Sequence, residues 1–590
     1  MRRVLAAAAA LALLAACGRG APPPEATVFD LAEAYFEEML ALNPVFATNL
    51  GDERYNDRLA IDIGPAHRAA VRELEDRYLA AVEAIDPARL DEEARVTRDT
   101  FLHGLRQGVE GREFPTELMP VDQLFSMPQV LAVLGSGAGA QPFRNAQDYR
   151  NFMARMDDFS AWVDQAIANM RDGIERGVVH PRPVVAKIIP QLDAMLRDDP
   201  AETVFWGPIE NLPDGLDAAE RAALIAEWRE RMAGTLLPAY ARLRDFMLAE
   251  YLPASRASVG WSDLPGGEAW YAYRVRRETT TEMTPEDIHR LGLSEVARLR
   301  GEMDRVRREV GFEGDLAAFF EFLKTDPQFF FTSPDEVLEA YRELKERIDA
   351  ALPALFSDFP RLDYELRAVE EFRAASAPGA FYEAPSLDGT RPGIFYVNTF
   401  NLRSQPRYGT ETLSVHEASP GHHFQVAIAM EQDQLPRIRR FASYVGFDEG
   451  WALYAESLGH ELGLFADPYQ YYGRLNDEQL RAMRLVVDTG LHAFGWSREQ
   501  AIDYMLENSS LAEGDVVAEV ERYIVWPGQA LGYKIGEFEL GEMRADAARA
   551  LGERFDIKAW HSMVLRGGAL PLEVLAARNQ RWIEAQLAAD

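Results

Sequence analysis

The sequence is almost free of cysteine: Cys17 is the only one among 590 residues. A single thiol cannot form an intramolecular disulfide or a thiolate zinc site, and its place near the N-terminus also argues against a cysteine nucleophile. The chain also lacks an excess of basic residues, with 62 Lys and Arg against 95 Asp and Glu and a net charge of −33. Such a charge repels phosphate backbones, so we expect no nucleic acid partner.

Long apolar runs and linkers are also missing. After residue 26 the sequence contains no apolar run near 18 residues and no Gly/Ser-rich or Pro-rich linker. A helix needs about 20 apolar residues to span a bilayer, so we expect no transmembrane span in the mature chain. With 47% hydrophobic and 27% charged residues, the composition is that of a folded protein. We predict a single large domain, built of lobes, over residues 27–590.

The N-terminus has the features of an export signal at residues 1–16, where two arginines precede a short apolar run. The run ends in Leu-Ala-Ala-Cys, which resembles the bacterial lipobox, in which the cysteine becomes the lipidated first residue. We therefore predict lipidation at Cys17, a flexible tether over residues 17–26, and a lipid-anchored protein on the periplasmic side of the cell envelope. Gly18 differs from the usual inner-membrane retention signal, which favours the outer membrane. Chance placement of the lone cysteine is the alternative.

Most of the chain carries apolar residues at helical spacing, as in the segment from Ile288 to Val310. N-capping signals precede such segments at Thr284, Ser333 and Ser497. These patterns predict a mainly α fold. The exception is residues 379–400, where two β-type runs flank a turn-rich segment and predict a hairpin.

Three of the ten histidines lie within eight residues, in the motif HEASPGHHFQ at 416–425. Zinc-peptidase helices of the HExxH type place two imidazoles one turn apart, with a glutamate between them close to the metal. On an unbroken helix, His416 and His423 would share a face, whereas His422 would lie about 120° away. A proline and a glycine between them predict a break that could bring His422 back toward His416. The alternative is a group of histidines that came together by accident in the core or on the surface.

A second acidic motif, EGWALYAE, follows at residues 449–456. Its two glutamates are seven residues apart and therefore share one face of a helix whose other positions are mostly apolar. A buried carboxylate needs a partner, and a metal ion at the adjacent helix would supply one. The alternative is that Glu449 stabilises the helix N-terminus while Glu456 faces solvent.

Together with RPGIFYVNT at 391–399 and WPGQALGYKIG at 526–536, these motifs resemble the bacterial family called domain of unknown function 885, many of whose members are predicted lipoproteins. The resemblance covers essentially the whole mature chain. That family is similar to the gluzincin zinc peptidases of the thimet oligopeptidase and carboxypeptidase Taq type. The resemblance implies a large, multi-helix, two-lobed fold around a deep active-site cleft, with the small hairpin or sheet at the cleft. In such a metallopeptidase-like domain, the site-bearing part would be about residues 378–540.

The same resemblance implies one Zn²⁺ per chain, held by His416, His422 and Glu449, with Glu417 as the general base. His423 either replaces His422 or lies just outside the ligands, because this sequence has extra residues between the first and second histidines of the family motif. A zinc site of this kind activates water and polarises a carbonyl group, while Glu417 takes up the proton and returns it to the leaving amine.

Further residues are candidates for supporting roles. Glu456 is expected to accept a hydrogen bond from a ligand imidazole, with a structural salt bridge as the alternative. Tyr533 and His492 are candidate donors to the oxyanion of a tetrahedral intermediate, and for each of them a packed or surface position is the alternative.

The predicted hairpin suggests a mode of substrate binding. An exposed strand edge over residues 394–399 would pair with the backbone of an extended peptide, although a purely structural hairpin is the alternative. The substrate-binding residues expected on this basis are Phe395, Tyr396, Val397 and Asn398. Short peptides are accordingly the expected substrates.

The sequence thus predicts an envelope-anchored, zinc-dependent peptidase that hydrolyses short peptides. One alternative is a non-catalytic lipoprotein that binds peptides or envelope components, and another is a zinc hydrolase of a non-peptide amide or ester. Glu417 favours an enzyme, because a binding protein has no need of a carboxylate directly after the first ligand. The oligomeric state is not predicted.

Overall fold

The computed structural model describes residues 24–370, 374, 378–385 and 391–589. The predicted signal peptide, the predicted lipidation site Cys17 and residues 18–23 of the predicted tether lie outside these residues. The first described helix, α2, begins at Pro24 and so includes the last three residues that we expected in the tether. Proline is favoured in the first turn of a helix because the amide hydrogen it lacks would be unpaired there.

The described chain is mainly helical, as predicted. The α-helices before the sheet are α2 (Pro24–Leu42), α3 (Pro44–Asn49), α4 (Pro65–Glu83), α5 (Glu92–Gly111), α6 (Met127–Gly135), α7 (Ala146–Arg176), α8 (Arg182–Ala194), α9 (Gly207–Glu210), α10 (Ala218–Arg231), α11 (Leu237–Phe246), α12 (Leu252–Ala254), α13 (Gly267–Thr279), α14 (Pro285–Glu309), α15 (Leu316–Thr325) and α16 (Pro334–Ala351). Those after it are α18 (Thr410–Glu417), α19 (His422–Met430), α20 (Arg437–Arg440), α21 (Val445–Ser457), α22 (Pro468–His492), α23 (Arg498–Asn508), α24 (Glu513–Val525), α25 (Gly532–Leu551), α26 (Ile557–Leu565) and α27 (Leu572–Ala588).

The predicted helix starts are confirmed by their caps. The side chains of Thr284, Ser333 and Ser497 each accept a hydrogen bond from a backbone amide in the first turn that follows. The apolar stripe of α14 is buried, and this helix lies against α22 over much of its length. Because α22 also contributes side chains to the cavity described below, this packing helps to hold that wall in place.

The sheet has three strands, β1 (Tyr364–Ala368), β2 (Ala380–Glu383) and β3 (Gly393–Val397), in the order β1-β3-β2. Strands β2 and β3 are antiparallel and form the predicted hairpin, whereas β1 pairs with β3 in parallel. The sequence analysis missed β1, whose short segment YELRA alternates with charged residues and lacks a strong β signal.

The expectation of an exposed edge at β3 is wrong. Because β1 occupies the side of β3 that the hairpin leaves open, β3 is the central strand and all five of its residues are buried. The four residues expected to bind substrate, Phe395, Tyr396, Val397 and Asn398, are buried as well. They support the sheet from within and do not line the cavity described below.

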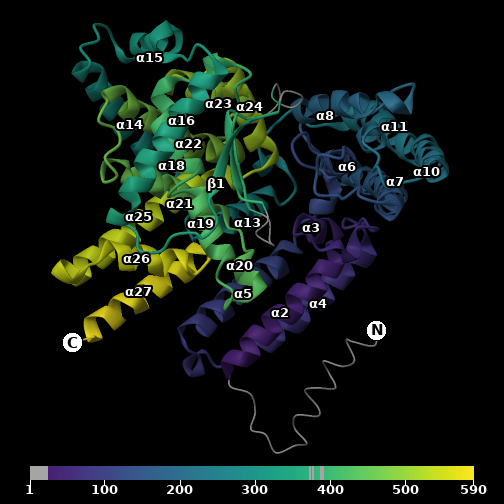
Figure 1. Cartoon of the computed structure of the whole chain (residues 1–590), viewed down its shortest axis with the longest axis horizontal. Helices are drawn as coiled ribbons and strands as arrows, with labels where there is room; N and C mark the ends of the chain where they lie inside the picture. Colours follow the sequence, from purple (N-terminus) through teal and green to yellow (C-terminus); the bar gives the residue numbers. More distant parts are fainter. Residues whose placement is uncertain (1–23, 371–373, 375–377, 386–390, 590) are drawn as a thin grey trace, which may run out of the picture.

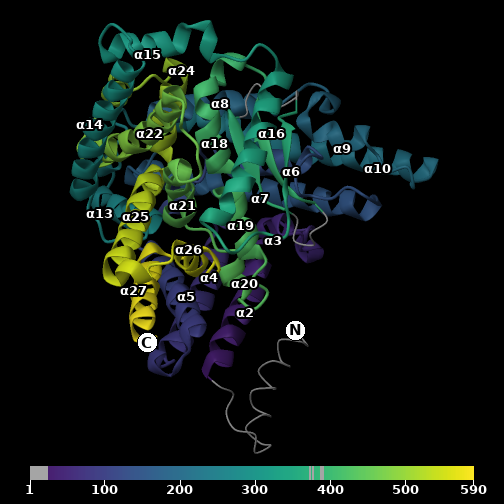
Figure 2. The same ribbon diagram turned by 60° about the vertical axis from the view of Figure 1, so that its left-hand side comes forward.

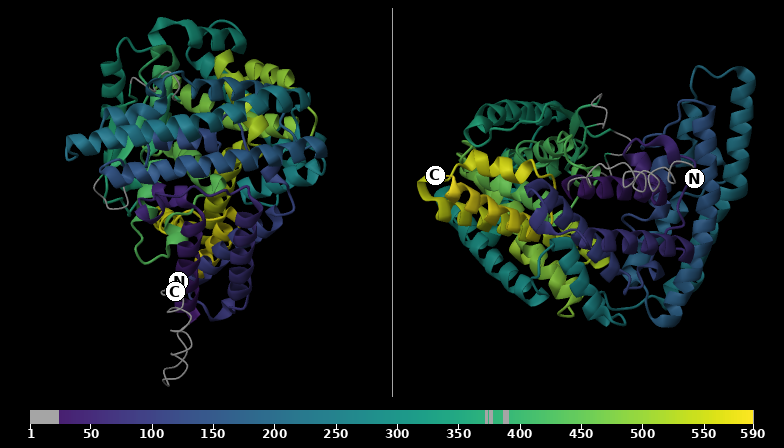
Figure 3. Two further views of the ribbon diagram at one scale, coloured as in Figure 1. Left: turned by 90° about the vertical axis from the view of Figure 1, so that its right-hand side faces the viewer. Right: turned by 90° about the horizontal axis from the view of Figure 1, so that it is seen from below.

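The C-terminal helix packs against a helix from the N-terminal part of the chain. Figures 1 and 2 show α27, near the C-terminus, beside α5 from the N-terminal part. Arg578 and Arg581 of α27 form ion pairs of 2.7 and 2.8 Å with Glu93 and Glu92 of α5. Helices α7, α10 and α11 lie on the opposite side of the molecule from α26 and α27 (Figures 1 and 3). Among the described residues, no helix combines the length and apolar character needed to cross a membrane.

Candidate metal centre and its cavity

The histidine motif is split between two helices, as its proline and glycine predicted. Helix α18 ends at Glu417 and α19 begins at His422, with a cis peptide bond between Ser419 and Pro420. A Cβ atom on Gly421 would lie 2.0 Å from the carbonyl oxygen of His416, so only glycine allows this close approach. The break brings the rings of His416 and His422 to a centroid distance of 4.8 Å, nearly perpendicular to each other.

Helix α21 supplies the third member of the group. Oε2 of Glu449 lies 3.3 Å from Nε2 of His422 and 3.6 Å from Nε2 of His416. One potential ligand atom from each of the three residues falls within 4.8 Å of the others. The indole N–H of Trp451, also on α21, donates a hydrogen bond of 2.8 Å to the carbonyl oxygen of Pro420, which ties this helix to the break.

The three residues fit a metal ion. Oε2 of Glu449 is buried and has no hydrogen-bond partner in the described part of the chain, which is costly for a carboxylate that binds nothing. Two imidazoles and one carboxylate are also the donors of a common catalytic zinc site. The group formed by His416, His422 and Glu449 is therefore a candidate metal centre.

The charges in the group reinforce each other. Burial by itself would lower the pKa of His416, but the neighbouring carboxylates of Glu449 and Glu456 outweigh burial and raise that pKa to about 10. Burial likewise favours a neutral Glu449, yet the neighbouring imidazoles hold its pKa well below the ordinary value. Glu449 is therefore an anion at neutral pH, as a metal ligand must be.

Glu456 lies next to His416. It shares one face of α21 with Glu449, as the spacing of seven residues predicted. Its Oε1 is 2.8 Å from Nδ1 of His416, and its Oε2 accepts a hydrogen bond of 2.8 Å from Thr412 Oγ1. Only 2% of Glu456 is exposed, which excludes the alternative of a solvent-facing carboxylate. With Nδ1 directed at this acceptor, Nε2 of His416 is the nitrogen that would bind a metal ion, which would displace the proton from it.

The side chain of His423 contacts the sheet and not the candidate metal centre. Its Nδ1 lies 3.1 Å from the hydroxyl of Tyr382, and its ring packs against Tyr364 at a centroid distance of 4.9 Å. Burial lowers the pKa of His423 to about 4, so its imidazole is neutral near pH 7. The geometry thus brings His422, and not His423, to His416 and Glu449, and His423 connects α19 to the sheet instead of adjoining the metal centre.

The candidate metal centre opens into a cavity of about 670 Å³ that is also lined by Glu417 and Tyr533. The carboxylate of Glu417 has no hydrogen bond or ion pair to any residue that the structure describes. Burial and the charge of Glu449 raise the pKa of Tyr533, so its hydroxyl stays protonated. Tyr533 comes close because α25 touches α21 at glycines: a Cβ on Gly450 would lie 2.5 Å from Cα of Gly536.

The proposal of His492 as an oxyanion donor is wrong. Its Nδ1 accepts a hydrogen bond from the amide of Trp261 (3.1 Å), and its Nε2 lies 2.9 Å from the carbonyl oxygen of Tyr523. Burial lowers its pKa to about 3, and the side chain does not line the cavity. A histidine with both nitrogens occupied by backbone groups is part of the core.

The sequence analysis missed a group of arginines in the same cavity: Arg481 and Arg484 of α22 and Arg522 of α24. Nε of Arg481 and Nη1 of Arg484 are buried and have no hydrogen-bond partner among the described residues. Asp477, Arg481 and Arg484 recur at helical spacing on one face of α22, and this charged stripe was the available signal. Sequence alone does not show that Arg522 joins them from another helix.

Comparison with solved structures supports this fold. The crystal structure of a "putative lipoprotein" from Colwellia psychrerythraea is 27% identical with a TM-score of 0.88, covering 95% of this chain and 100% of that chain. A "putative lipoprotein of unknown function" from Shewanella oneidensis is 17% identical with a TM-score of 0.74, covering 93% of this chain and 98% of that chain. A Pyrococcus furiosus carboxypeptidase is 12% identical over 96% and 99% of the two chains, and its TM-score of 0.41 is too low to carry an argument.

Family membership rests on a direct match. No curated protein matches the chain. The model of the family described as "Bacterial protein of unknown function (DUF885)" matches residues 44–578, which include the candidate metal centre and the arginines around it. The chain therefore belongs to the DUF885 family of bacterial proteins, as its motifs predicted.

Proposed function

We propose that the protein is a zinc-dependent peptidase that is anchored by lipid at the cell envelope and hydrolyses short peptides. The observation that carries this proposal is the convergence of His416, His422 and Glu449 beside a free carboxylate, Glu417, in one cavity. A zinc ion held by these three residues would supply Lewis-acid activation of water and of a carbonyl group.

The other residues of the cavity have the roles that such a reaction needs. Glu417 makes no competing hydrogen bond to the described residues, so its carboxylate is available to accept a proton and to return it to the leaving amine. The Tyr533 hydroxyl accepts a hydrogen bond of 3.2 Å from Arg522 and can donate its own hydrogen to a developing oxyanion. Glu456 holds His416 in the orientation and tautomer that a ligand requires.

Two features of the cavity favour a peptide as the substrate. Strand β2 lines the cavity through Ala380, Phe381 and Tyr382 and pairs with one strand only among the described residues, so its outer edge suits the backbone of an extended peptide. The buried guanidinium nitrogens of Arg481 and Arg484 suit a carboxylate. Together these features favour a substrate whose C-terminal carboxylate lies close to the scissile bond.

Anchoring at the envelope is supported by the lipobox-like segment before Cys17 and by the description of the Colwellia relative as a lipoprotein. The metal cavity and a neighbouring cavity of about 1010 Å³ share the lining residue Val426, which is consistent with the expected cleft. A zinc hydrolase of another amide or ester would use the same metal centre. Arg481, Arg484 and the edge of β2 favour a peptide over these other substrates.

The test uses full-length protein purified in detergent. We expect about one zinc per chain by elemental mass spectrometry and hydrolysis of short peptides that stops with a chelator and returns with added zinc. Glu417→Gln should keep the metal and lower turnover by about 10²- to 10⁴-fold. Absence of metal, or unchanged turnover in Glu417→Gln, would contradict the proposal, and the first result would favour a binding protein. Glu499→Gln, on a carboxylate with 71% of its side chain exposed, is the control.

A further inference from the structure

A separate cavity of about 600 Å³ lies among α4, α5 and α13. Five of its lining residues are arginines: Arg68, Arg72, Arg112, Arg274 and Arg277. We propose that this arginine cavity is a subsite for acidic side chains of the peptides that the metal centre cleaves. The proposal rests on the proposed function and adds the substrate class, namely peptides that carry glutamate or aspartate at a distance from the scissile bond.

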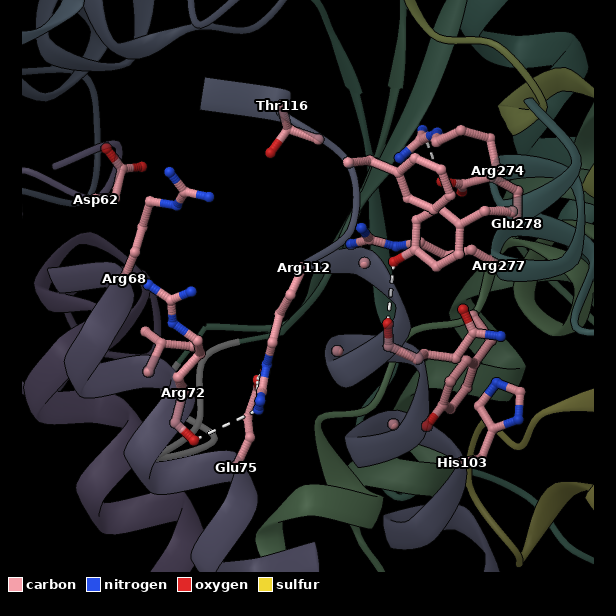
Figure 4. A pocket seen from close by; sticks show the side chains of 18 of the residues that line it. Asp62, Arg68, Arg72, Glu75, His103, Arg112, Thr116, Arg274, Arg277 and Glu278 are labelled. Carbon is pink, nitrogen blue, oxygen red and sulfur yellow. Dashed lines mark hydrogen bonds and ion pairs between the residues drawn. The ribbon is translucent and has the colours of Figure 1, made fainter. Parts of the chain in front are cut away.

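The lining of the arginine cavity contains more arginines than carboxylates. It has five arginines and three carboxylates, those of Asp62, Glu75 and Glu278, in a chain whose net charge is −33. Because Glu117 and Asp76, just outside the lining, also pair with Arg68 and Arg112, the positive charge without a partner among the described residues is that of Arg72 and Arg277. Figure 4 shows Arg68 and Arg72 on one side of the open space and Arg277 reaching toward it from the other side. A concentration of positive charge in an acidic protein attracts anions to that place.

Some of the arginines are held in position, whereas others are available. Arg112 forms ion pairs of 2.7 and 2.6 Å with Glu75 and Asp76, and Arg274 forms one of 2.7 Å with Glu278. By contrast, the guanidinium groups of Arg72 and Arg277 have no hydrogen bond or ion pair to the described residues. A guanidinium without a partner can bind a carboxylate through two parallel hydrogen bonds.

Helix α5 leaves room for a ligand. Gly104, Gly108 and Gly111 line the arginine cavity and recur at helical spacing, although each costs about 1 kcal/mol in helix stability relative to alanine. Two of them allow close contacts: a Cβ on Gly108 would lie 2.4 Å from Oε1 of Glu75, and a Cβ on Gly111 would lie 2.4 Å from the Tyr273 hydroxyl. A Cβ on Gly104 would meet nothing within 4 Å, so this glycine leaves the space open.

The arginine cavity and the metal centre are linked through neighbouring walls. Ser443 lines both the arginine cavity and the cavity of about 1010 Å³, which in turn shares Val426 with the metal cavity. Val445, at the start of α21, also lines the arginine cavity, and Glu449 lies one turn further along the same helix, an axial rise of about 6 Å. An extended peptide bound at the metal centre would therefore have only a short distance to span to the arginine cavity.

The test measures binding by fluorescence anisotropy on the zinc-loaded, full-length Glu417→Gln variant, which keeps bound peptides intact. The probes are labelled alanine-rich octapeptides that carry two glutamates or two glutamines, each with a free or an amidated C-terminus. We expect the glutamate peptide to bind about tenfold more tightly, with a difference that shrinks at high salt and persists after amidation. Arg72→Gln with Arg277→Gln should remove this preference.

Two controls isolate the effect of charge at the site. Arg89→Gln changes the charge of the chain equally but lies outside the arginine cavity, so it should keep the preference. Gly104→Glu and Gly104→Gln add nearly the same volume at an open position, and only the glutamate should abolish the preference for acidic peptides.

The outcomes separate the two proposals. Equal affinity for the glutamate and glutamine peptides, or an equal loss in Arg89→Gln, would overturn the acidic subsite and leave the peptidase intact. If the preference for the glutamate peptide disappears when the peptide C-terminus is amidated, the bound carboxylate is that of the C-terminus. This result would also overturn the subsite for acidic side chains. If no peptide binds, the proposed function fails and the subsite fails with it.

Discussion

Oε2 of Glu449 lies 3.3 Å from Nε2 of His422 and has no hydrogen-bond partner among the described residues. The two residues come from different helices, α21 and α19, and their contact depends on the helix break between Glu417 and His422. The contact between these two residues brings the two sequence motifs together in one candidate metal centre.

Glu449→Ala should lose the metal, because it removes the only carboxylate among the three grouped residues. We expect the zinc content to fall from about one per chain to near zero by elemental mass spectrometry, with the fold retained by circular dichroism. Glu461→Ala, on a more exposed carboxylate of the same region, should keep the metal. Full zinc occupancy in Glu449→Ala would show that another residue is the third ligand.

His422→Ala and His423→Ala should differ in metal content. The first variant removes a residue of the candidate metal centre, whereas the second removes a contact with Tyr382 and the sheet. We expect only His422→Ala to empty the site, and His423→Ala to keep zinc with a lower melting temperature, since its side chain is buried. A metal-free His423→Ala that remains folded would contradict this assignment.

Glu456→Gln should weaken zinc binding by about 10- to 100-fold without abolishing it, because the neutral amide holds the His416 imidazole less strongly than the carboxylate does. Competition with a chelator measures the affinity. Thr412→Val, which removes the hydrogen bond to the other oxygen of Glu456, should have a smaller effect in the same direction. An unchanged affinity in Glu456→Gln would assign this carboxylate a structural role only.

His492 should affect stability against acid and not the reaction. Burial lowers its pKa to about 3 from an ordinary 6.5, so the unfolded chain takes up a proton below pH 6.5 that the folded chain does not. The contribution of the neutral His492 to the free energy of unfolding is therefore complete above pH 6.5. It is lost as the pH falls from 6.5 toward 3, by up to about 1.4 kcal/mol per pH unit.

His492→Gln should accordingly show a free energy of unfolding that declines less between pH 6.5 and 4.5 than that of the parent, from a lower starting value. Denaturant unfolding at several pH values measures this slope. Part of the decline will remain, because burial also lowers the pKa values of His423 and His561 to about 4. Turnover by the folded variant at pH 7 should stay close to that of the parent. A 100-fold loss of turnover would show that His492 takes part in the reaction.

Several local features were predictable from the sequence because they depend on neighbours along the chain. The stripe from Ile288 to Val306 and the cap at Thr284 define α14, and Pro420 with Gly421 predicts the break in the histidine motif. The β2–β3 hairpin follows from its β-type runs and turn residues. These signals are short in range, so one sequence is sufficient to recognise them.

The errors concern contacts between distant segments. His492 lies near Gly490 in the C-terminal third of the sequence, and only the fold shows that Trp261 and Tyr523 enclose it. The position of β3 depends on β1, which pairs with it across an intervening segment. Similarly, Arg522 joins Arg481 and Arg484 in one cavity although it comes from another helix.

By itself, the sequence determined the helical class, the helix caps, the break in the histidine motif and the family. Only the tertiary structure decided that His422 and not His423 meets Glu449, that β3 lies in the middle of the sheet, and that two groups of arginines line separate cavities. The physical reason is that helix propensity and capping act over a few residues. The direction of a buried side chain, in contrast, is set by packing against segments far away in the chain.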